Sequence, residues 1–149
     1  LLFELLQKTF DISARSASKV AVIYIDLDDF KPINDRLGHF AGDKALVVMA
    51  ERLRSLLRSS DTVARVGGDE YIAVLANVSD REQIRLAAAK ILDGCVKSFS
   101  IDGHECCISL SMGIAIYPDD GSDIETIVGA ADKAMYGIKR AQKNGFAFA

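Results

Sequence analysis

The chain has 149 residues, of which 50% are hydrophobic and 26% are charged. That length is enough for one domain with a buried core, and the composition is that of a soluble globular protein. The net charge of −3 gives no basic surface for nucleic acid or for an anionic membrane. The apolar run Val20–Ile25 is too short to cross a bilayer. We therefore expect a single domain over 1–149 that contacts neither nucleic acid nor a membrane.

The three cysteines, Cys95, Cys106 and Cys107, are odd in number and lack metal-ligand spacing. They favour free thiols in a reducing compartment, which predicts a cytoplasmic location. The sequence opens inside a helical pattern, Leu1–Leu6, without a helix start signal or a signal peptide. We expect it to be excised from a longer protein, which could itself be anchored in a membrane.

The first half of the chain predicts a helix, a buried strand and two further helices. Leucines at helical spacing indicate a helix over about 1–13, and the apolar run Val20–Leu27 is typical of a central strand buried on both faces. Acids followed by a proline predict a short helix over Asp28–Asp35, with the acids as its N-cap. Gly38–Asp43 is predicted as a turn that leads into a long amphipathic helix over Asp43–Arg58.

The second half adds two hairpins and two helices. Val63–Leu75 holds two apolar runs around a Gly-Gly pair, which predicts a hairpin whose tight turn uses the positive φ that glycine allows. A helix is predicted over Asp80–Val96, and a second hairpin from Phe99–Ile101 and Glu105–Tyr117. The last helix is predicted over Asp123–Lys143. Strands and helices mixed around one sheet predict an α+β fold, an α/β sandwich.

Carboxylates stand where two neighbouring strands are expected to end. Asp26 closes the buried strand, and Asp69 and Glu70 follow the Gly-Gly turn. With the backbone carbonyl of Leu27, Asp26 and Asp69 would offer the hard oxygen ligands that Mg²⁺ prefers. Each acid also has an ordinary explanation, as a residue of a solvated turn or strand end.

Four residues are candidates for binding phosphate. Phe30 and Lys31 lie in the first turn of the predicted short helix, where the helix N-terminus and an ammonium could both face a triphosphate. Lys139 and Lys143 lie one turn apart on the last helix. The alternative is that the lysines are solvated surface charges and that Phe30 is a core residue.

Two further residues have the chemistry to read a purine base. Asn34 and Asp43 lie on either side of the predicted turn. An asparagine offers a donor and an acceptor, and an aspartate only accepts, so together they match the hydrogen-bonding edge of guanine. Taken alone, Asp43 is as well explained as a helix cap.

Three long motifs contain these residues, apart from the two lysines of the last helix. They are Asp26-Leu-Asp-Asp-Phe-Lys-Pro-Ile-Asn34, Gly38-His-Phe-Ala-Gly-Asp43 and Arg65-Val-Gly-Gly-Asp-Glu-Tyr71, with Ser111–Ala115 and Ala131–Tyr136 as later motifs. In order and spacing they resemble the GGDEF family of diguanylate cyclases. The resemblance covers nearly the whole chain. It implies a palm-like fold, similar to that of nucleotidyl cyclases and polymerases, with a mixed, mainly antiparallel five-stranded sheet flanked by helices.

The resemblance also implies an activity. Two GTP molecules, one held by each domain of an antiparallel homodimer, would condense to cyclic di-GMP with loss of two pyrophosphates. Asp26, the Leu27 carbonyl and Asp69 would hold Mg²⁺, or Mn²⁺ in its place. Asp69 or Glu70 would assist deprotonation of the attacking hydroxyl. The partners implied are GTP, cyclic di-GMP, a second copy of the domain, and a covalently linked sensor.

The resemblance assigns the remaining candidates as well. Asn34 and Asp43 would bind guanine. The phosphates would lie at Phe30, Lys31, Lys139 and Lys143. The pair Arg58 and Asp61 matches the family's Arg-x-x-Asp inhibitory site, where product would bind away from the active site and cause feedback inhibition; the ordinary explanation is an arginine at a helix end followed by a turn aspartate.

The chain departs from the family pattern in two places, the signature motif and the last helix over Ile138–Asn144, where the family usually has alanine before the first lysine and Gly-Arg-Asn at the end. Tyr71 stands where the family has phenylalanine, so a hydroxyl enters a core position and needs a partner. Lys143 stands for arginine, which keeps the charge and loses the bidentate fork. Neither change removes a metal or guanine ligand. The rival hypothesis is a catalytically silent domain that senses GTP or cyclic di-GMP for an attached phosphodiesterase domain.

Overall fold

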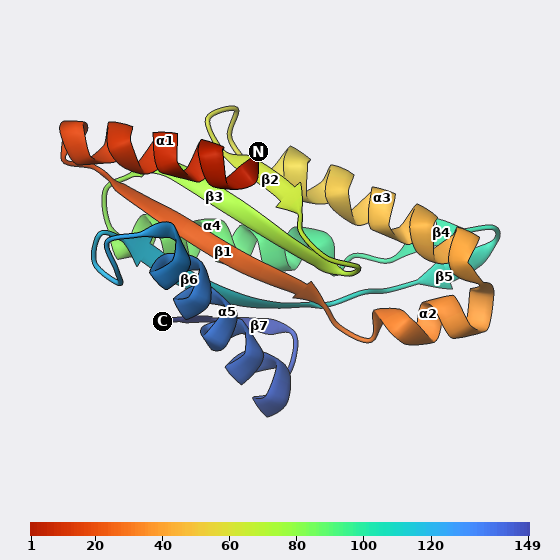
Figure 1. The fold of residues 1–149 in the computed structure, drawn as a ribbon. Helices are drawn as coiled ribbons and strands as arrows, with labels where there is room; N and C mark the ends of the chain where they lie inside the picture. Colours follow the sequence, from red (N-terminus) through yellow and green to blue (C-terminus); the bar gives the residue numbers. More distant parts are fainter.

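Five strands form the central sheet of the computed structural model, which describes residues 1–149 (Figure 1). The strand order is β2-β3-β1-β6-β7, antiparallel except for the parallel pair β6–β7, and β4 and β5 form a separate hairpin. The elements are α1 (Leu2–Ser16), β1 (Lys19–Leu27), α2 (Phe30–Leu37), α3 (His39–Leu56), β2 (Thr62–Arg65), β3 (Glu70–Val78), α4 (Arg81–Cys95), β4 (Phe99–Ile101), β5 (His104–Cys106), β6 (Leu110–Tyr117), α5 (Ile124–Ala141) and β7 (Gly145–Phe148).

Helices cover both faces of this sheet, so the predicted α+β sandwich is confirmed (Figure 1). Alternate residues of β1 point to opposite faces. Ile23 and Ile25 lie in the larger core, which α3 and α4 close, whereas Val20 and Val22 lie in the smaller core beneath α1 and α5. The even-numbered residues at the end of β1 therefore face the α1 and α5 side.

The prediction of a central, doubly buried strand is confirmed in β1, which pairs with β3 on one side and β6 on the other. The register sets Asp26 opposite Glu70 on β3 and opposite Ser111 on β6. Ser111 in turn pairs with Gly145 at the start of β7. The strands β1, β3, β6 and β7 therefore end or begin at the same end of the sheet. Asp26, on the central strand β1, lies in the middle of that end.

The second predicted hairpin is wrong in its long strand. The expected strand Glu105–Tyr117 is divided into β5 and β6, with Cys107 to Ser109 between them, because β5 pairs with β4 outside the main sheet while β6 enters it beside β1. The fifth strand of the main sheet is instead β7, which the sequence did not predict. A four-residue strand that pairs in parallel with a distant strand has no local pattern that marks it.

Two turns also differ from their predictions. Gly67 and Gly68 do not adopt positive φ, because a four-residue loop joins β2 to β3 and a tight two-residue turn is not required. The predicted turn Gly38–Asp43 is helical from His39 onward, and only Gly38 leaves the helical region, at φ 91°. The expected caps of α2 are absent: Asp29 lies at the N-cap position in a left-handed conformation and its side chain makes no capping bond.

The remaining helices begin as predicted. The Asp80 carboxylate accepts a hydrogen bond from the Gln83 backbone amide at 2.8 Å, and Asp123 does the same for Thr126. All three cysteines are free thiols, and burial raises the pKa of Cys95 to about 11. No helix is both long and apolar enough to span a membrane.

Candidate active site

Three carboxylates gather where β1 ends and β3 begins. One oxygen from each of Asp26, Asp69 and Glu70 lies within 4.8 Å of the others. The sheet register produces this cluster, because Asp26 faces Glu70 across the ladder and the Leu27 amide donates to the Asp69 carbonyl at 3.0 Å. The structure therefore brings Asp26 and Asp69 together, as predicted. The residue directly opposite Asp26 in the strand pairing is Glu70, which the sequence did not indicate.

Tyr24 belongs to the same cluster, although the sequence analysis did not single it out. Its hydroxyl donates a hydrogen bond of 2.7 Å to Glu70 Oε2. Burial, the bond to Glu70 and the charges of Asp132 and Asp26 raise the pKa of Tyr24, so it stays protonated and remains a donor. The signal was present: Tyr24 precedes Asp26 by two residues, which on a strand gives the same face.

A lysine from α5 supplies positive charge to this cluster. Lys139 Nζ lies 2.7 Å from Asp26 Oδ1 in an ion pair, and it donates to the Leu27 carbonyl at 3.3 Å. Apart from this ion pair, no hydrogen-bond donor reaches the buried Oδ1. Lys139 was predicted to bind phosphate; here it contacts the two groups predicted to bind metal.

The pKa of the Asp26 carboxyl is raised above its ordinary value. Burial is the largest cause; the ion pair with Lys139 opposes it, and the charges of Asp69 and Glu70 add to it. Burial and the charge of Glu70 also raise the pKa of Asp132 on α5. A single ammonium therefore does not compensate the negative charge that this edge of the sheet collects.

The donor set fits a hard divalent cation. Carboxylate oxygens of three residues and a backbone carbonyl converge, and one buried carboxylate oxygen has only an ion-pair partner. Mg²⁺, Mn²⁺ and Ca²⁺ all prefer such oxygen ligands. The side chains that would hold the ion are Asp26 and Asp69, together with the Leu27 carbonyl, which contacts the same ammonium as Asp26, and Glu70 lies within reach of the two acids.

The loop after β1 is held by the second acid of the motif. Asp28 is only 2% exposed, and its carboxylate accepts hydrogen bonds from the Ser109 and Ser111 hydroxyls and from the Asn144 amide. Asp28 thus fixes the loop to the start of β6 and, through the Asn144 backbone amide, to the segment between α5 and β7, a structural role that sequence reasoning missed. Its neighbour Asp29 is exposed and pairs with Lys143 at 2.7 Å.

The other predicted phosphate residues lie in the first turn of α2, directly after this loop. Phe30 is 7% exposed and belongs to the core, whereas Lys31 is exposed and has no ion-pair partner. Lys143 points to the same loop through Asp29. The fold thus brings Lys31, Lys139 and Lys143 to the end of the sheet where the three carboxylates meet.

The two residues predicted to bind guanine come from adjoining helices. Asn34 on α2 packs against Gly42 in the first turns of α3, so closely that a Cβ at Gly42 would lie 1.6 Å from Asn34 Oδ1. Asp43 follows Gly42 and is exposed. Because Gly42 has no side chain, the Asn34 amide can approach the first turns of α3, which also carry Asp43, so Gly42 is part of the candidate site.

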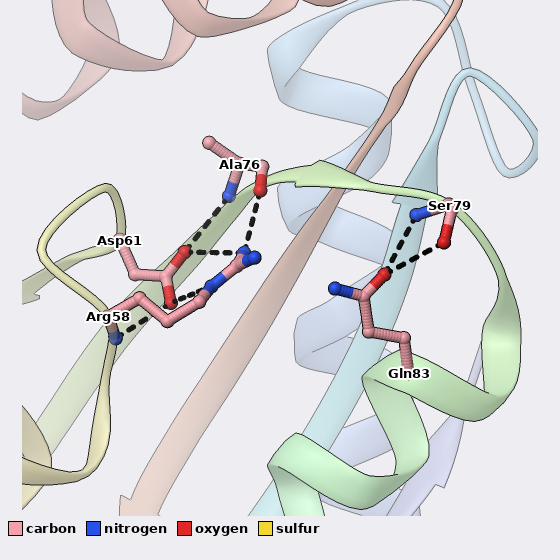
Figure 2. Close-up of polar contacts among 5 residues, drawn as sticks. All are labelled: Arg58, Asp61, Ala76, Ser79 and Gln83. Atoms are coloured by element: carbon pink, nitrogen blue, oxygen red, sulfur yellow. Dashed lines mark hydrogen bonds and ion pairs between the residues drawn. The ribbon is translucent and has the colours of Figure 1, made fainter.

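The predicted inhibitory pair is joined within the chain (Figure 2). Asp61 Oδ1 accepts from Arg58 Nη2 at 3.0 Å, and Asp61 Oδ2 accepts from Arg58 Nε and from the Arg58 amide. Arg58 Nη2 also donates to the Ala76 carbonyl at 2.7 Å, and the Ala76 amide donates back to Asp61. The Asp61 side chain is 3% exposed and the Arg58 side chain 48%, so the guanidinium is held in place with one edge open to solvent.

Residues 1–145 match the family described as diguanylate cyclase, GGDEF domain. The bifunctional diguanylate cyclase/cyclic di-GMP phosphodiesterase MucR of Pseudomonas aeruginosa is 38% identical over 148 residues, which are 99% of this chain and 22% of MucR. The diguanylate cyclase TpbB of the same species is 43% identical over 127 residues, 82% of this chain and 28% of TpbB. The cyclic di-GMP phosphodiesterase NbdA, also from that species, is 36% identical over 87% of this chain and 16% of its own length. The chain spans less than a third of each relative.

Solved structures agree with these sequence matches. The GGDEF domain of TpbB from Pseudomonas aeruginosa superposes with a TM-score of 0.96 at 37% identity, covering 99% of this chain and 87% of that one. The active GGEEF domain of a diguanylate cyclase from Vibrio cholerae superposes with a TM-score of 0.85 at 30% identity, covering 95% and 89%. From the acidic cluster at the end of the sheet and the family match over residues 1–145, the chain belongs to the GGDEF family.

Proposed function

We propose that this domain is a Mg²⁺-dependent diguanylate cyclase, which condenses two GTP molecules into cyclic di-GMP and two pyrophosphates. The observation that carries the proposal is the convergence of Asp26, Asp69 and Glu70 within 4.8 Å, with the Leu27 carbonyl in contact with the ammonium that pairs with Asp26. Relatives at 38% and 43% identity that are named diguanylate cyclases support it. Mn²⁺ would substitute for Mg²⁺ because both take oxygen ligands.

The residues divide the reaction between them. Asp26, Asp69 and the Leu27 carbonyl would hold the metal ion, which supplies charge neutralisation at the triphosphate. Glu70, oriented by the Tyr24 hydroxyl, is within the cluster and would accept the proton of the attacking 3′-hydroxyl, a role it shares with Asp69. Phosphoryl transfer depends mainly on positioning and on electrostatic stabilisation, and a cluster of fixed charges suits both.

Substrate binding would use the adjoining helices. Asn34 and Asp43 would bind the guanine edge, with Gly42 keeping the space that Asn34 needs. The phosphates would lie along the first turn of α2, at Phe30 and Lys31, against Lys139 on α5 and against Lys143 just beyond the end of that helix. Because each domain would hold one GTP, catalysis requires an antiparallel homodimer in which the two sites face each other.

Regulation and context form a second part of the proposal. Arg58 and Asp61 would bind cyclic di-GMP and inhibit the enzyme, since the guanidinium is fixed and partly exposed. The domain would work in the cytoplasm, linked to a sensor that controls dimerisation, because its relatives are much longer than the chain.

A sensing role is the second candidate. The relative NbdA is named a cyclic di-GMP phosphodiesterase, although it is 36% identical to this chain. In such a role the domain would bind GTP or cyclic di-GMP and leave the chemistry to an attached phosphodiesterase domain. The intact acidic cluster favours the cyclase.

The test is to incubate the domain, fused to a dimerising coiled coil, with GTP and Mg²⁺ and to resolve the nucleotides by chromatography. Asp69→Ala removes one member of the cluster. Asp119→Ala is the matched control, because Asp119 pairs with Lys19 at the opposite end of β1.

Product from the parent and from Asp119→Ala, but not from Asp69→Ala, is the expected result. GTP binding without product in the dimeric parent would favour the sensing role. No binding of GTP or cyclic di-GMP would contradict both functions.

A further inference from the structure

The cation that pairs with Asp26 in this structure is a side chain of the protein. Lys139 Nζ contacts Asp26 Oδ1 at 2.7 Å and the Leu27 carbonyl at 3.3 Å. These are two of the three groups that would hold the metal ion. The side chains are 27% exposed for Lys139 and 11% exposed for Asp26, so water screens this pair only partly.

The position of Lys139 follows from the packing of α5 on the sheet. Gly113 of β6 lies directly beneath the helix, where a Cβ would stand 2.0 Å from the Ala131 carbonyl. Met135, one turn later, is buried against the sheet. Lys139 lies a further turn along the same side of α5, which brings its ammonium to the end of β1.

We infer that Lys139 is the resident counter-cation of Asp26 in the nucleotide-free domain, and that it opposes the binding of a divalent ion unless a triphosphate draws the ammonium away. This inference rests on the proposed function, since it concerns the same metal and nucleotide. It adds an order to their binding: the metal ion enters with the triphosphate and binds weakly alone.

Electrostatic competition is the physical reason. An ammonium and a divalent cation cannot share Asp26 Oδ1 and the Leu27 carbonyl without strong repulsion, because like charges a few ångströms apart in a partly buried site interact strongly. Lys139 must therefore move before the metal ion can use both oxygens. Moving it away without a new partner leaves an ammonium unpaired, and this cost weakens metal binding.

A triphosphate removes that cost. Its oxygens are acceptors for an ammonium, and Lys143, just beyond the end of α5, is likewise held by a carboxylate, Asp29, at 2.7 Å. Each lysine can exchange a carboxylate for a phosphate oxygen. Because linkage is reciprocal, the metal ion then increases nucleotide affinity by the same factor as the nucleotide increases metal affinity.

The experiment measures Mn²⁺ binding to the domain without nucleotide, from the loss of the electron paramagnetic resonance signal of free Mn²⁺. Lys139→Met removes the ammonium and keeps the length of the side chain. Lys133→Met is the matched control, since it makes the same change in charge on the exposed side of the same helix. Lys139→Gln, which keeps a donor for the Leu27 carbonyl, is a second variant in case Lys139→Met folds poorly.

We expect Mn²⁺ alone to bind Lys139→Met and Lys139→Gln at least about tenfold more tightly than the parent, because the competing charge is gone. Lys133→Met should bind Mn²⁺ like the parent. Adding Asp26→Asn to Lys139→Met should abolish the gain. Mn²⁺ should also raise the melting temperature of the Lys139 variants more than that of the parent.

Equal or weaker Mn²⁺ binding by both Lys139 variants overturns the inference, as does an equal gain in Lys133→Met. A separate titration of the parent with Mn²⁺ and a GTP analogue bridged by methylene between the α- and β-phosphates tests the proposed function. If the parent binds the analogue with Mn²⁺ and the Lys139 variants show no gain, only the inference fails. If the parent does not bind the analogue, the proposed function fails, whatever the lysine variants do.

Discussion

The hydroxyl of Tyr71 donates a hydrogen bond of 2.9 Å to the backbone carbonyl of Leu46. Tyr71 follows Glu70 at the start of β3, and Leu46 lies on α3, one turn after Asp43. The extra oxygen at this core position thus has a partner, and it ties the strand that carries the acids to the helix that carries Asp43. Tyr71 is 2% exposed, so this bond is shielded from water.

Tyr71→Phe should destabilise the fold and leave the chemistry intact. The ring still fills the core, and the lost hydrogen bond is worth about 1 kcal/mol in the free energy of unfolding. Urea unfolding followed by circular dichroism measures this change. A tenfold fall in kcat, with little change in stability, would show instead that the hydroxyl acts in the site.

Tyr24→Phe, in contrast, should lower the activity and leave the stability of the fold nearly unchanged. It removes the donor that holds Glu70 Oε2 at 2.7 Å, on the side of the sheet where the carboxylates meet. Loss of an outer partner of a site residue costs about 10–100-fold in activity or metal affinity. We expect kcat for cyclic di-GMP formation to fall by about tenfold while KM for GTP changes little. Unchanged kcat in a folded Tyr24→Phe would count against a role for Tyr24 in orienting Glu70.

Asp26→Asn should abolish the activity and raise the stability of the fold. Burial and the neighbouring acids raise the pKa of Asp26 in spite of the ion pair with Lys139, which means that the folded state favours the neutral form of this side chain. A neutral asparagine should therefore raise the melting temperature, by about 2–4 °C if the gain is near 1 kcal/mol. Differential scanning calorimetry measures it, and cyclic di-GMP formation should be lost. A lower melting temperature would mean that the ion pair outweighs the cost of burial.

Gly42→Ala should weaken GTP binding through Asn34. The new Cβ would overlap Asn34 Oδ1, so the amide must turn away from its place against α3. We expect Kd for GTP to rise by on the order of tenfold, the loss of roughly one good hydrogen bond to the base. Isothermal titration with Ca²⁺ in place of Mg²⁺ measures the Kd. Gly129→Ala on α5, where a Cβ meets nothing within 4 Å, is the control and should bind GTP like the parent.

The N-cap of α5 should make stability depend on pH. The Thr126 amide donates to Asp123, which lowers the pKa of that carboxyl in the folded state. The stabilisation is therefore complete above the ordinary aspartate pKa and is lost as the pH falls through the lowered value. Asp123→Ala should melt about 2–4 °C below the parent at pH 7 and approach it under acid conditions. If the difference in melting temperature between Asp123→Ala and the parent stays constant as the pH falls below the aspartate pKa, the charge of Asp123 is irrelevant to capping.

The sequence by itself determined most of the secondary structure and the identity of the acidic residues. The alternation and length of apolar runs identified β1, the β2–β3 hairpin and the long helices, because each pattern is local and repeats with the period of its element. The same patterns placed Asp26 at a strand end and Asp69 after a turn. Local turn chemistry was harder to read: Gly42 is helical, and Gly67 and Gly68 have ordinary φ.

Only the tertiary structure decided how those residues meet. The pairing of Asp26 with Glu70 depends on strand register. The hydrogen bond from Tyr24 to Glu70 depends on which face of the sheet each side chain takes. The parallel pairing of β7 with β6 depends on where α5 ends. Lys139 lies 112 positions from Leu27 in the sequence and contacts its carbonyl, because α5 packs against Gly113. No local period encodes such a contact. It arises from the packing of whole elements, and that packing gives Asp26 a lysine as its cation.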